Sequence, residues 1–195
     1  MKLTKILTLA LLALAFTAAC AGKKDSKSEA VEAQAADTPA AIVYFSATGN
    51  TRAQAQRLGK RLGLPVHEIV PAEVYTEADL DWRDENSRSS RESADSTLRP
   101  PMADTIPGLD GVKTVFLGYP VWWNRYPNII ATFMERHKKQ LEGKRIVPFA
   151  TSGSSTINNS VKTMGLHFPF VTVGNGLLMN DVSDAQIDEW AQPYL

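Results

Sequence analysis

Short apolar runs rich in strand-forming residues alternate along this chain with segments of helical periodicity. The runs that predict strands are residues 41–45, 66–70, 112–119, 145–150 and 170–173. The segments that predict helices are residues 51–62, 127–141, 155–166 and 183–190, the last of them capped by Ser183. Apolar strands separated by helices form a parallel sheet that is covered on both faces. Because the crossovers between such strands are right-handed, the pattern predicts a doubly wound α/β domain.

Residues 71–111 interrupt the alternation, since they carry no strand signal and are dense in serine, arginine and acidic residues. Thr76 and Asp79 have the spacing of a capping box, which predicts a polar helix within residues 76–93. We expect Trp82, which lies in this stretch, to be a packing residue. A segment of this length is either a lid beside a ligand or a solvated insertion, and its polar composition favours the solvated insertion.

The beginning of the chain has the pattern of an export signal. Lys2 and Lys5 precede an uncharged apolar run, residues 6–16, which is too short to cross a bilayer, since a spanning helix needs about 20 residues. Cys20 follows directly after small residues and resembles the lipidation site of a bacterial lipoprotein signal.

These features predict how the chain is divided and where the protein is located. We expect residues 1–19 to be a lipoprotein-type signal peptide, residues 20–39 a flexible linker and residues 40–195 the folded domain. The protein is then exported to the bacterial cell envelope and held on a membrane by a lipid on Cys20. The alternative is an ordinary secretory signal cut after the triplet 19–21, which leaves a soluble periplasmic or secreted protein.

Composition narrows the classes of function. The chain carries 21 basic and 21 acidic side chains, a balance that argues against a nucleic-acid partner. Its single cysteine excludes an intramolecular disulfide, and its three histidines have no metal-ligand spacing, so we expect no metal site. The chain has no GxSxG motif, and no side chain can be named as a catalytic acid or base.

The first of three complementary loops follows the first predicted strand. Residues 46–51 offer the hydroxyls of Ser46, Thr48 and Thr51, the flexible Gly49 and the amides of a helix N-terminus. These groups can hold a phosphate without a lysine. The segment has neither the P-loop pattern nor the GxGxxG pattern, which disfavours nucleoside triphosphate hydrolysis and dinucleotide binding.

The other two loops follow the third and fourth predicted strands. In the first of them Trp122 or Trp123 can stack on a flat aromatic ligand, although a tryptophan pair is more often core or interface. Because adjacent residues cannot easily present both indoles to one ring, we expect one to stack and the other to pack. The last loop, residues 151–155, is small and polar and supplies amide donors to the ligand's edge. The candidate cofactor-binding residues are Ser46, Ala47, Thr48, Gly49, Asn50, Thr51, Pro120, Val121, Trp122, Trp123, Asn124, Thr151, Ser152, Gly153 and Ser154.

These segments together resemble the flavodoxin family. The resemblance rests on SATGNT at residues 46–51, GYPVWWNRYP at 118–127 and PFATSG at 148–153, in that order. It implies a five-stranded sheet of order 2-1-3-4-5 and a noncovalently bound FMN. The phosphate would lie on residues 46–51, and the ring would lie between residues 120–124 and 151–155. Ser154 stands where the family commonly has glycine, so this loop would be strained if it required a positive φ.

The resemblance implies a redox protein of the cell envelope that carries electrons or reduces small acceptors. FMN and an unidentified redox partner are the partners it implies. NAD(P)H-dependent reduction of quinones falls within this hypothesis. The alternative is a flavin-free lipoprotein that keeps the fold and serves as a binding or scaffold domain.

Overall fold

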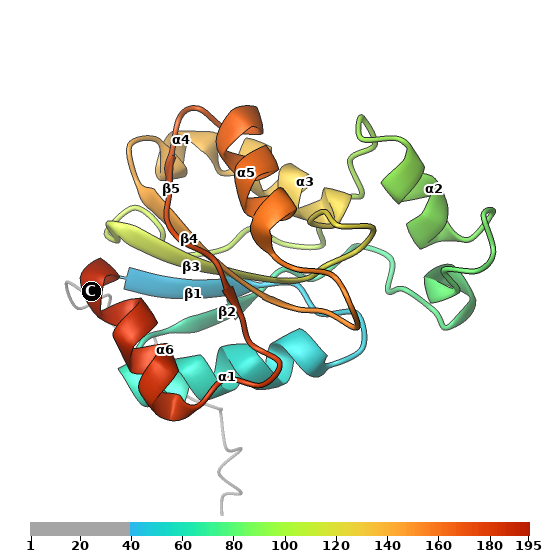
Figure 1. Ribbon diagram of the computed structural model, residues 1–195. Coiled ribbons are helices and arrows are strands. Elements are labelled where there is room, and N and C mark those ends of the chain that lie inside the picture. The colour runs from blue at the N-terminus through green and yellow to red at the C-terminus, as the bar shows by residue number, and fades with distance from the viewer. Residues whose placement is uncertain (1–39) are drawn as a thin grey trace, which may run out of the picture. The chain divides into compact units, whose positions relative to one another are not determined.

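A single parallel sheet organises the computed structural model, which describes residues 40–195 (Figure 1). Its strand order is β2-β1-β3-β4-β5, as the resemblance implied. A short additional strand, β6, pairs with β4 beyond the end of β5, so β5 and β6 are two halves of one interrupted edge strand. The strands are β1 (Ala40–Tyr44), β2 (Val66–Glu68), β3 (Thr114–Pro120), β4 (Arg145–Thr151), β5 (Thr172–Val173) and β6 (Leu177–Leu178).

Helices cover both faces of the sheet, and α2 stands apart from them (Figure 1). The α1 and α6 helices lie on one face, while α3, α4 and α5 lie on the other. The helices are α1 (Asn50–Leu62), α2 (Arg88–Ala94), α3 (Asn128–Arg136), α4 (Lys138–Leu141), α5 (Asn158–His167) and α6 (Asp184–Ala191), with 3-10 turns η1 (Ala78–Leu80) and η2 (Gln192–Tyr194).

Alternate residues of the central strands β1, β3 and β4 enter two separate hydrophobic cores. Along β1, Val43 belongs to the buried cluster that contains Ile129 of α3, whereas Ile42 belongs to the cluster that contains Leu58 of α1. Successive side chains of a strand point to opposite faces, so a strand buried on both faces is apolar at every position. This is why the strands were visible in the sequence as continuous apolar runs.

The position of the Phe149 ring on β4 depends on Gly118 of β3. A Cβ atom at this position would lie 2.3 Å from Cζ of Phe149, the residue paired with it on β4. Non-bonded carbon atoms do not approach each other this closely. The buried Phe149 ring therefore occupies the space that a side chain at position 118 would need. A glycine is therefore required at this position, just before the loop that follows β3.

One predicted helix, residues 127–141, is divided into α3 and α4 at His137. The His137 side chain is buried, and its Nε2 accepts a hydrogen bond from the backbone N–H of Ile106 at 3.0 Å. Its Nδ1 lies 3.1 Å from the carbonyl oxygen of Phe133, to which it donates in the matching neutral tautomer. Burial lowers the pKa of this imidazole below its ordinary value of 6.5.

The neutral state of His137 leads to a prediction about stability and pH. Its pKa is lower in the folded state than in the unfolded state, so its contribution is complete above pH 6.5 and is lost as the pH falls below that value. We expect the urea concentration at the midpoint of unfolding to decrease as the pH is lowered from 7.5 to about 5.5. The decrease in the midpoint over this pH range should be smaller in His137→Gln than in the parent, even if the variant is less stable at every pH. The rest should come from His67, whose pKa burial also lowers. A decline of the same size in His137→Gln and the parent would contradict the assignment.

The polar helix expected within residues 76–93 forms only near their end, as α2, and it does not begin at the capping box of Thr76 and Asp79. Thr76 and Asp79 make the reciprocal hydrogen bonds of a capping box, but the segment that this box begins is only the 3-10 turn η1. The carboxylates of Asp81 and Asp84 then accept hydrogen bonds from backbone amides two residues further on, at 3.0 and 2.9 Å. Such aspartate turns compete with helix formation, so the chain stays irregular until α2 begins after Ser87.

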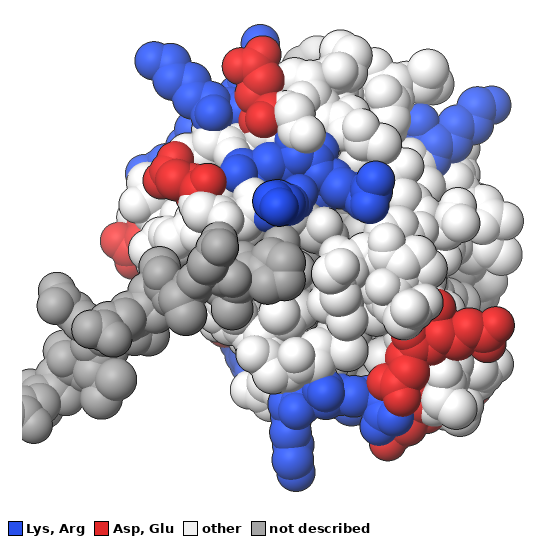
Figure 2. All heavy atoms as spheres, turned by 90° about the vertical axis from the view of Figure 1, so that its left-hand side faces the viewer, with Lys and Arg blue, Asp and Glu red and all other residues white. Residues whose placement is uncertain are grey.

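Figure 2 shows the side of the domain that lies to the left in Figure 1. Basic side chains gather above the centre of this face, acidic side chains lie toward its edges, and a broad uncharged area lies between them. Among residues 40–195, no helix combines the length and the apolar character that a membrane crossing requires. The expected signal peptide, Cys20 and linker lie outside the described residues.

Candidate functional site

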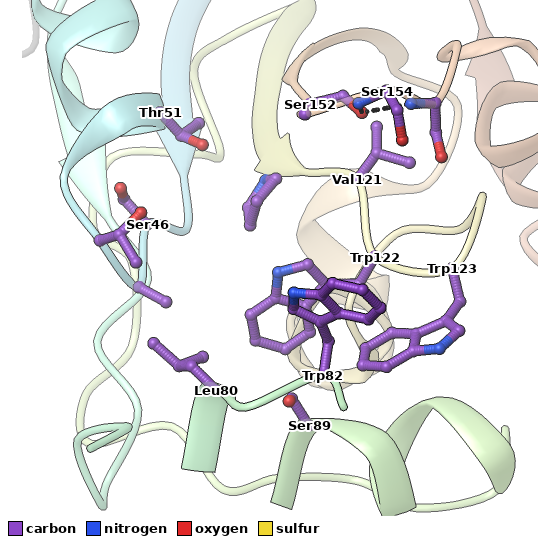
Figure 3. Close-up of a pocket in the computed structure, with 15 residues that line it drawn as sticks. Ser46, Thr51, Leu80, Trp82, Ser89, Val121, Trp122, Trp123, Ser152 and Ser154 are labelled. Atoms are coloured by element: carbon purple, nitrogen blue, oxygen red, sulfur yellow. Dashed lines mark hydrogen bonds between the residues drawn. The ribbon is translucent and has the colours of Figure 1, made fainter. Parts of the chain in front are cut away.

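Three loops meet at the carboxyl edge of the sheet and enclose a cavity of about 430 Å³. They meet because β1, β3 and β4 are neighbours in register, with Tyr44 opposite Gly118 and Gly118 opposite Phe149. The volume is within the range of small-molecule sites, roughly 300–1,000 Å³. Figure 3 shows the walls of this cavity, which is lined by Ser46, Ala47, Thr48, Thr51, Leu80, Trp82, Ser89, Pro120, Val121, Trp122, Trp123, Ser152, Gly153, Ser154 and Ser155.

The first loop presents the open N-terminus of α1. Gly49 precedes this helix with φ 89°, a left-handed conformation that glycine adopts without strain. The Ser46 hydroxyl accepts a hydrogen bond from the Gly49 amide at 3.1 Å and shapes the turn. No side chain of the described residues caps the first turn of α1, so its amide hydrogens remain available to an anion.

A buried hydroxyl pair joins the first loop to the third. The Oγ1 atoms of Thr51 and Thr151 lie 2.8 Å apart, and both residues are buried. Thr51 is therefore a structural link between α1 and the end of β4, while the exposed Thr48 keeps its hydroxyl at the cavity.

The second loop contains a tight turn that separates the two tryptophans. Trp122 and Arg125 exchange backbone hydrogen bonds of 2.9 and 2.8 Å, and the residues between them, Trp123 and Asn124, have φ values of 46° and 60°. Positive φ at both central positions defines a type I′ turn. Trp122 precedes the turn and packs edge-on against Phe45, at 5.8 Å between ring centroids. Trp123 is at the tip of the turn and is 44% exposed.

The third loop is held by Ser152 and Asn180. The Ser152 hydroxyl accepts hydrogen bonds from the amides of Ser154 and Ser155 at 3.3 and 2.8 Å. The Asn180 side chain donates to the Ser152 carbonyl oxygen at 2.6 Å and accepts from the Ser152 amide at 3.0 Å. Residues with positive φ in the described chain include neither Gly153 nor Ser154, so the serine at 154 is not strained. Strain was expected only if the loop required a positive φ at Ser154, and this condition is not met.

The insertion supplies a fourth wall, and the preference for a merely solvated segment is wrong. Leu80, Trp82 and Ser89 line the cavity across from Ser152 and Ser154 (Figure 3). The expectation that Trp82 packs in the interior is also wrong, since this side chain is 64% exposed.

A buried polar network fixes α2 to the rest of the domain. Glu92 accepts hydrogen bonds from the Tyr75 hydroxyl and from Arg88, whose guanidinium lies 4.0 Å from the centroid of the Tyr75 ring. Asn128 of α3 donates to the carbonyl oxygen of Glu92 at 2.6 Å. Burial, followed by the hydrogen bond to Glu92, raises the pKa of Tyr75 well above its usual range. Tyr75 also packs edge-on against Trp122, so the insertion and the tryptophan loop support each other.

Most of the predicted site residues line this cavity, and the others lie close to it. Asn50 and Thr151 line a neighbouring cavity of about 570 Å³ that shares the Thr48 and Ser152 walls. Gly49 and Asn124 line neither cavity and act through the backbone of their turns. The residues that the sequence did not indicate are Leu80, Trp82 and Ser89 in the first cavity and Ala53, Gln54 and Asn180 in the neighbouring one.

The lining favours binding of a ligand over acid-base chemistry. Hydroxyl, amide, aromatic and aliphatic groups make up the walls, and no lining residue is ionisable in the ordinary pH range. Within residues 40–195 no group of histidine, cysteine, aspartate and glutamate side chains could hold a metal ion.

Comparison with known proteins identifies the family. A family model for flavodoxin matches residues 40–194. The chain belongs to the flavodoxin family. None of the curated proteins is similar enough to match.

Solved structures of related flavodoxin-fold proteins agree with this assignment. A protein described as a flavoprotein from Bacteroides eggerthii is 41% identical with a TM-score of 0.76, over 80% of this chain and 96% of its own. A similarly described protein from Bacteroides uniformis is 40% identical with a TM-score of 0.72, over 78% and 97%. A flavoprotein from Lactobacillus acidophilus, solved in complex with FMN, is 18% identical with a TM-score of 0.62, over 78% and 97%, and shares the fold.

Proposed function

We propose that this flavodoxin-family protein binds FMN noncovalently in the described cavity and uses it for electron transfer. The observation that carries the proposal is the pairing of two unlike walls. One is the open N-terminus of α1 with the Ser46 and Thr48 hydroxyls, and the other is the aromatic wall around Trp122 and Trp123. FMN has a phosphate for the first wall and a flat ring for the second.

The residues present fit FMN in three respects. The donors at the first loop are backbone amides and hydroxyls, which suit a phosphate dianion at a helix N-terminus. The aromatic wall presents an exposed indole, that of Trp123, for stacking. The third loop faces the polar edge of a ring with small polar residues. The Ser152 hydroxyl and the Asn180 side chain already bind three of its amides, so Gly153 carries the amide left for a ligand. The FMN found in the Lactobacillus acidophilus flavoprotein, which shares the fold, supports the same ligand.

When bound, FMN supplies the redox chemistry, and the protein supplies binding and orientation. The tryptophans and the insertion restrict water at the ring, and the third loop sets the hydrogen bonds at its edge. Since no acid or base lines the cavity, we favour electron carriage or the reduction of small acceptors such as quinones, with NAD(P)H as the donor in the second case.

Titration of the purified chain with FMN tests this function. We expect quenching of flavin fluorescence on binding and a bound flavin that dithionite reduces and air reoxidises. Turnover of NAD(P)H with a quinone would assign reductase activity, and reduction without such turnover would favour a carrier. If no quenching occurs up to high micromolar FMN, the flavin function is wrong, and a flavin-free binding or scaffold domain takes its place.

We further propose that the protein is exported and anchored to a membrane of the bacterial envelope by a lipid on Cys20. Cys20→Ser removes the sulfur that would carry the lipid. We therefore expect this variant to move from the membrane fraction to the soluble fraction of the native host. Unchanged partitioning of Cys20→Ser, or a mature protein whose mass shows cleavage after Ala21, would contradict lipidation and favour the soluble secreted form.

A further inference from the structure

Ser89 carries a buried polar atom that has no partner. The residue is 2% exposed, and its Oγ makes no hydrogen bond with any of the described residues. Buried hydroxyls are almost always hydrogen-bonded, because a hydroxyl that loses its hydrogen bonds to water and gains no other partner destabilises the fold. An unpartnered hydroxyl at a cavity wall therefore indicates a group that is completed by something bound there.

Within the described residues, Ser89 is the one residue whose side chain has a buried polar atom without a partner. The neighbours Ser87 and Ser90 lie 2.9 Å apart through their hydroxyls, and Ser87 also caps α2 by accepting from the Ser90 amide. Ser89 lines the cavity beside Trp82 and Trp122, whereas Ser87 and Ser90 do not (Figure 3).

The position of Ser89 is fixed before any ligand binds. Glu92, one turn further along α2, is held by Tyr75 and Arg88, and Asn128 holds its backbone. A hydroxyl on such an anchored helix is preorganised, so a hydrogen bond to it requires little further ordering of the protein.

We propose that Ser89 is a flavin-binding residue, whose hydroxyl completes its hydrogen bond with the ring of FMN. This inference rests on the proposed function and adds the insertion to the ring site. The ring is the partner because the phosphate wall, marked by Ser46 and Thr51, lies across the cavity from Ser89 (Figure 3). The ring nitrogens and carbonyl oxygens are acceptors that a serine hydroxyl can reach as a donor.

The proposal predicts opposite effects of Ser89→Ala on stability and on affinity. Without ligand, the substitution removes an unsatisfied buried group, so we expect the melting temperature to rise by about 2–4 °C. With ligand, it removes a hydrogen bond, so we expect the dissociation constant for FMN to increase about tenfold. A residue with a purely structural role would not produce this reversal of sign.

Three flavins and two further variants make the test specific. FMN, riboflavin and lumiflavin share the ring, but riboflavin lacks the phosphate and lumiflavin also lacks the ribityl chain. Ser89→Ala should lower the affinity for all three flavins by a similar factor. Quenching of flavin fluorescence measures these affinities. Ser90→Ala removes a partnered hydroxyl from the same helix and should leave all three affinities unchanged. Ser89→Cys keeps a weak donor of similar size and should bind FMN more tightly than Ser89→Ala.

The outcomes separate this inference from the proposed function. If the parent binds no flavin, the function itself is wrong. If the parent binds FMN and Ser89→Ala binds it equally well, the function stands and the role of Ser89 is overturned. A loss of affinity for FMN and riboflavin but not for lumiflavin would also overturn the inference, because it would assign the hydroxyl to the ribityl chain.

Discussion

Replacing Trp122 by alanine is expected to lower the free energy of unfolding by about 3 kcal/mol. The indole of Trp122 lies edge-on to Tyr75 and Phe45, with centroid separations of 5.5 and 5.8 Å. It therefore joins the insertion to the main core. The expected loss is at the lower end of the range for large aromatic side chains, because Trp122 is only partly buried. Urea denaturation of the ligand-free protein measures it.

Trp123 is the matched comparison, since it is the next residue and is exposed. Asparagine tolerates the left-handed backbone at this position, so Trp123→Asn should change the free energy of unfolding by less than about 0.5 kcal/mol. The same variant removes the exposed indole, and we expect the affinity for FMN to fall about three- to tenfold. Equal losses of stability in Trp122→Ala and Trp123→Asn would contradict this division of roles.

The sheet was predictable because burial on both faces leaves a simple mark in the sequence. The runs at 41–45 and 145–150 are apolar at every position except Arg145, and they became β1 and β4 within one residue at each end. The edge was harder to predict. Residues 66–70 form only a three-residue strand, and the last strand is split into β5 and β6, because an edge strand has one neighbour and its limits depend on tertiary pairing.

The three loops of the candidate site were predictable for a related reason. The carboxyl ends of adjacent parallel strands lie together, so loops after the first, third and fourth strands must meet. The sequence predicted that one tryptophan packs and the other stacks, but not which one does which. That choice depends on a type I′ turn at Trp123 and Asn124, which lacks the usual Asn-Gly sequence.

The contribution of the insertion could not be inferred from local pattern. Its placement depends on contacts such as that between Tyr75 and Glu92, which are 17 residues apart, and that between Glu92 and Asn128, which are 36 apart. Neither pair has a periodic or capping signature. The polar composition of the segment therefore predicted a solvated insertion, although three of its residues line the cavity.

The sharpest test of the phosphate wall is Thr48→Ala. Thr48 is exposed at the cavity beside the open N-terminus of α1, and its Oγ1 accepts only a 3.3 Å hydrogen bond from the Asn50 side chain. Thr51 is a poorer probe, since its hydroxyl already pairs with Thr151 at 2.8 Å and its loss would also affect stability.

Thr48→Ala is expected to weaken FMN binding by roughly 1.5–3 kcal/mol, or about one to two orders of magnitude, because a hydrogen bond to a charged phosphate is lost. Riboflavin has no phosphate, so its affinity should be the same in Thr48→Ala and the parent. Thr163→Ala, on α5 and outside the cavity lining, is the matched control and should bind both flavins as the parent does. Fluorescence titration of the three proteins with the two flavins measures all of these affinities. A loss that is equal for FMN and riboflavin would show that Thr48 acts on the ring or the ribityl chain, and the assignment of the phosphate to this loop would then be wrong.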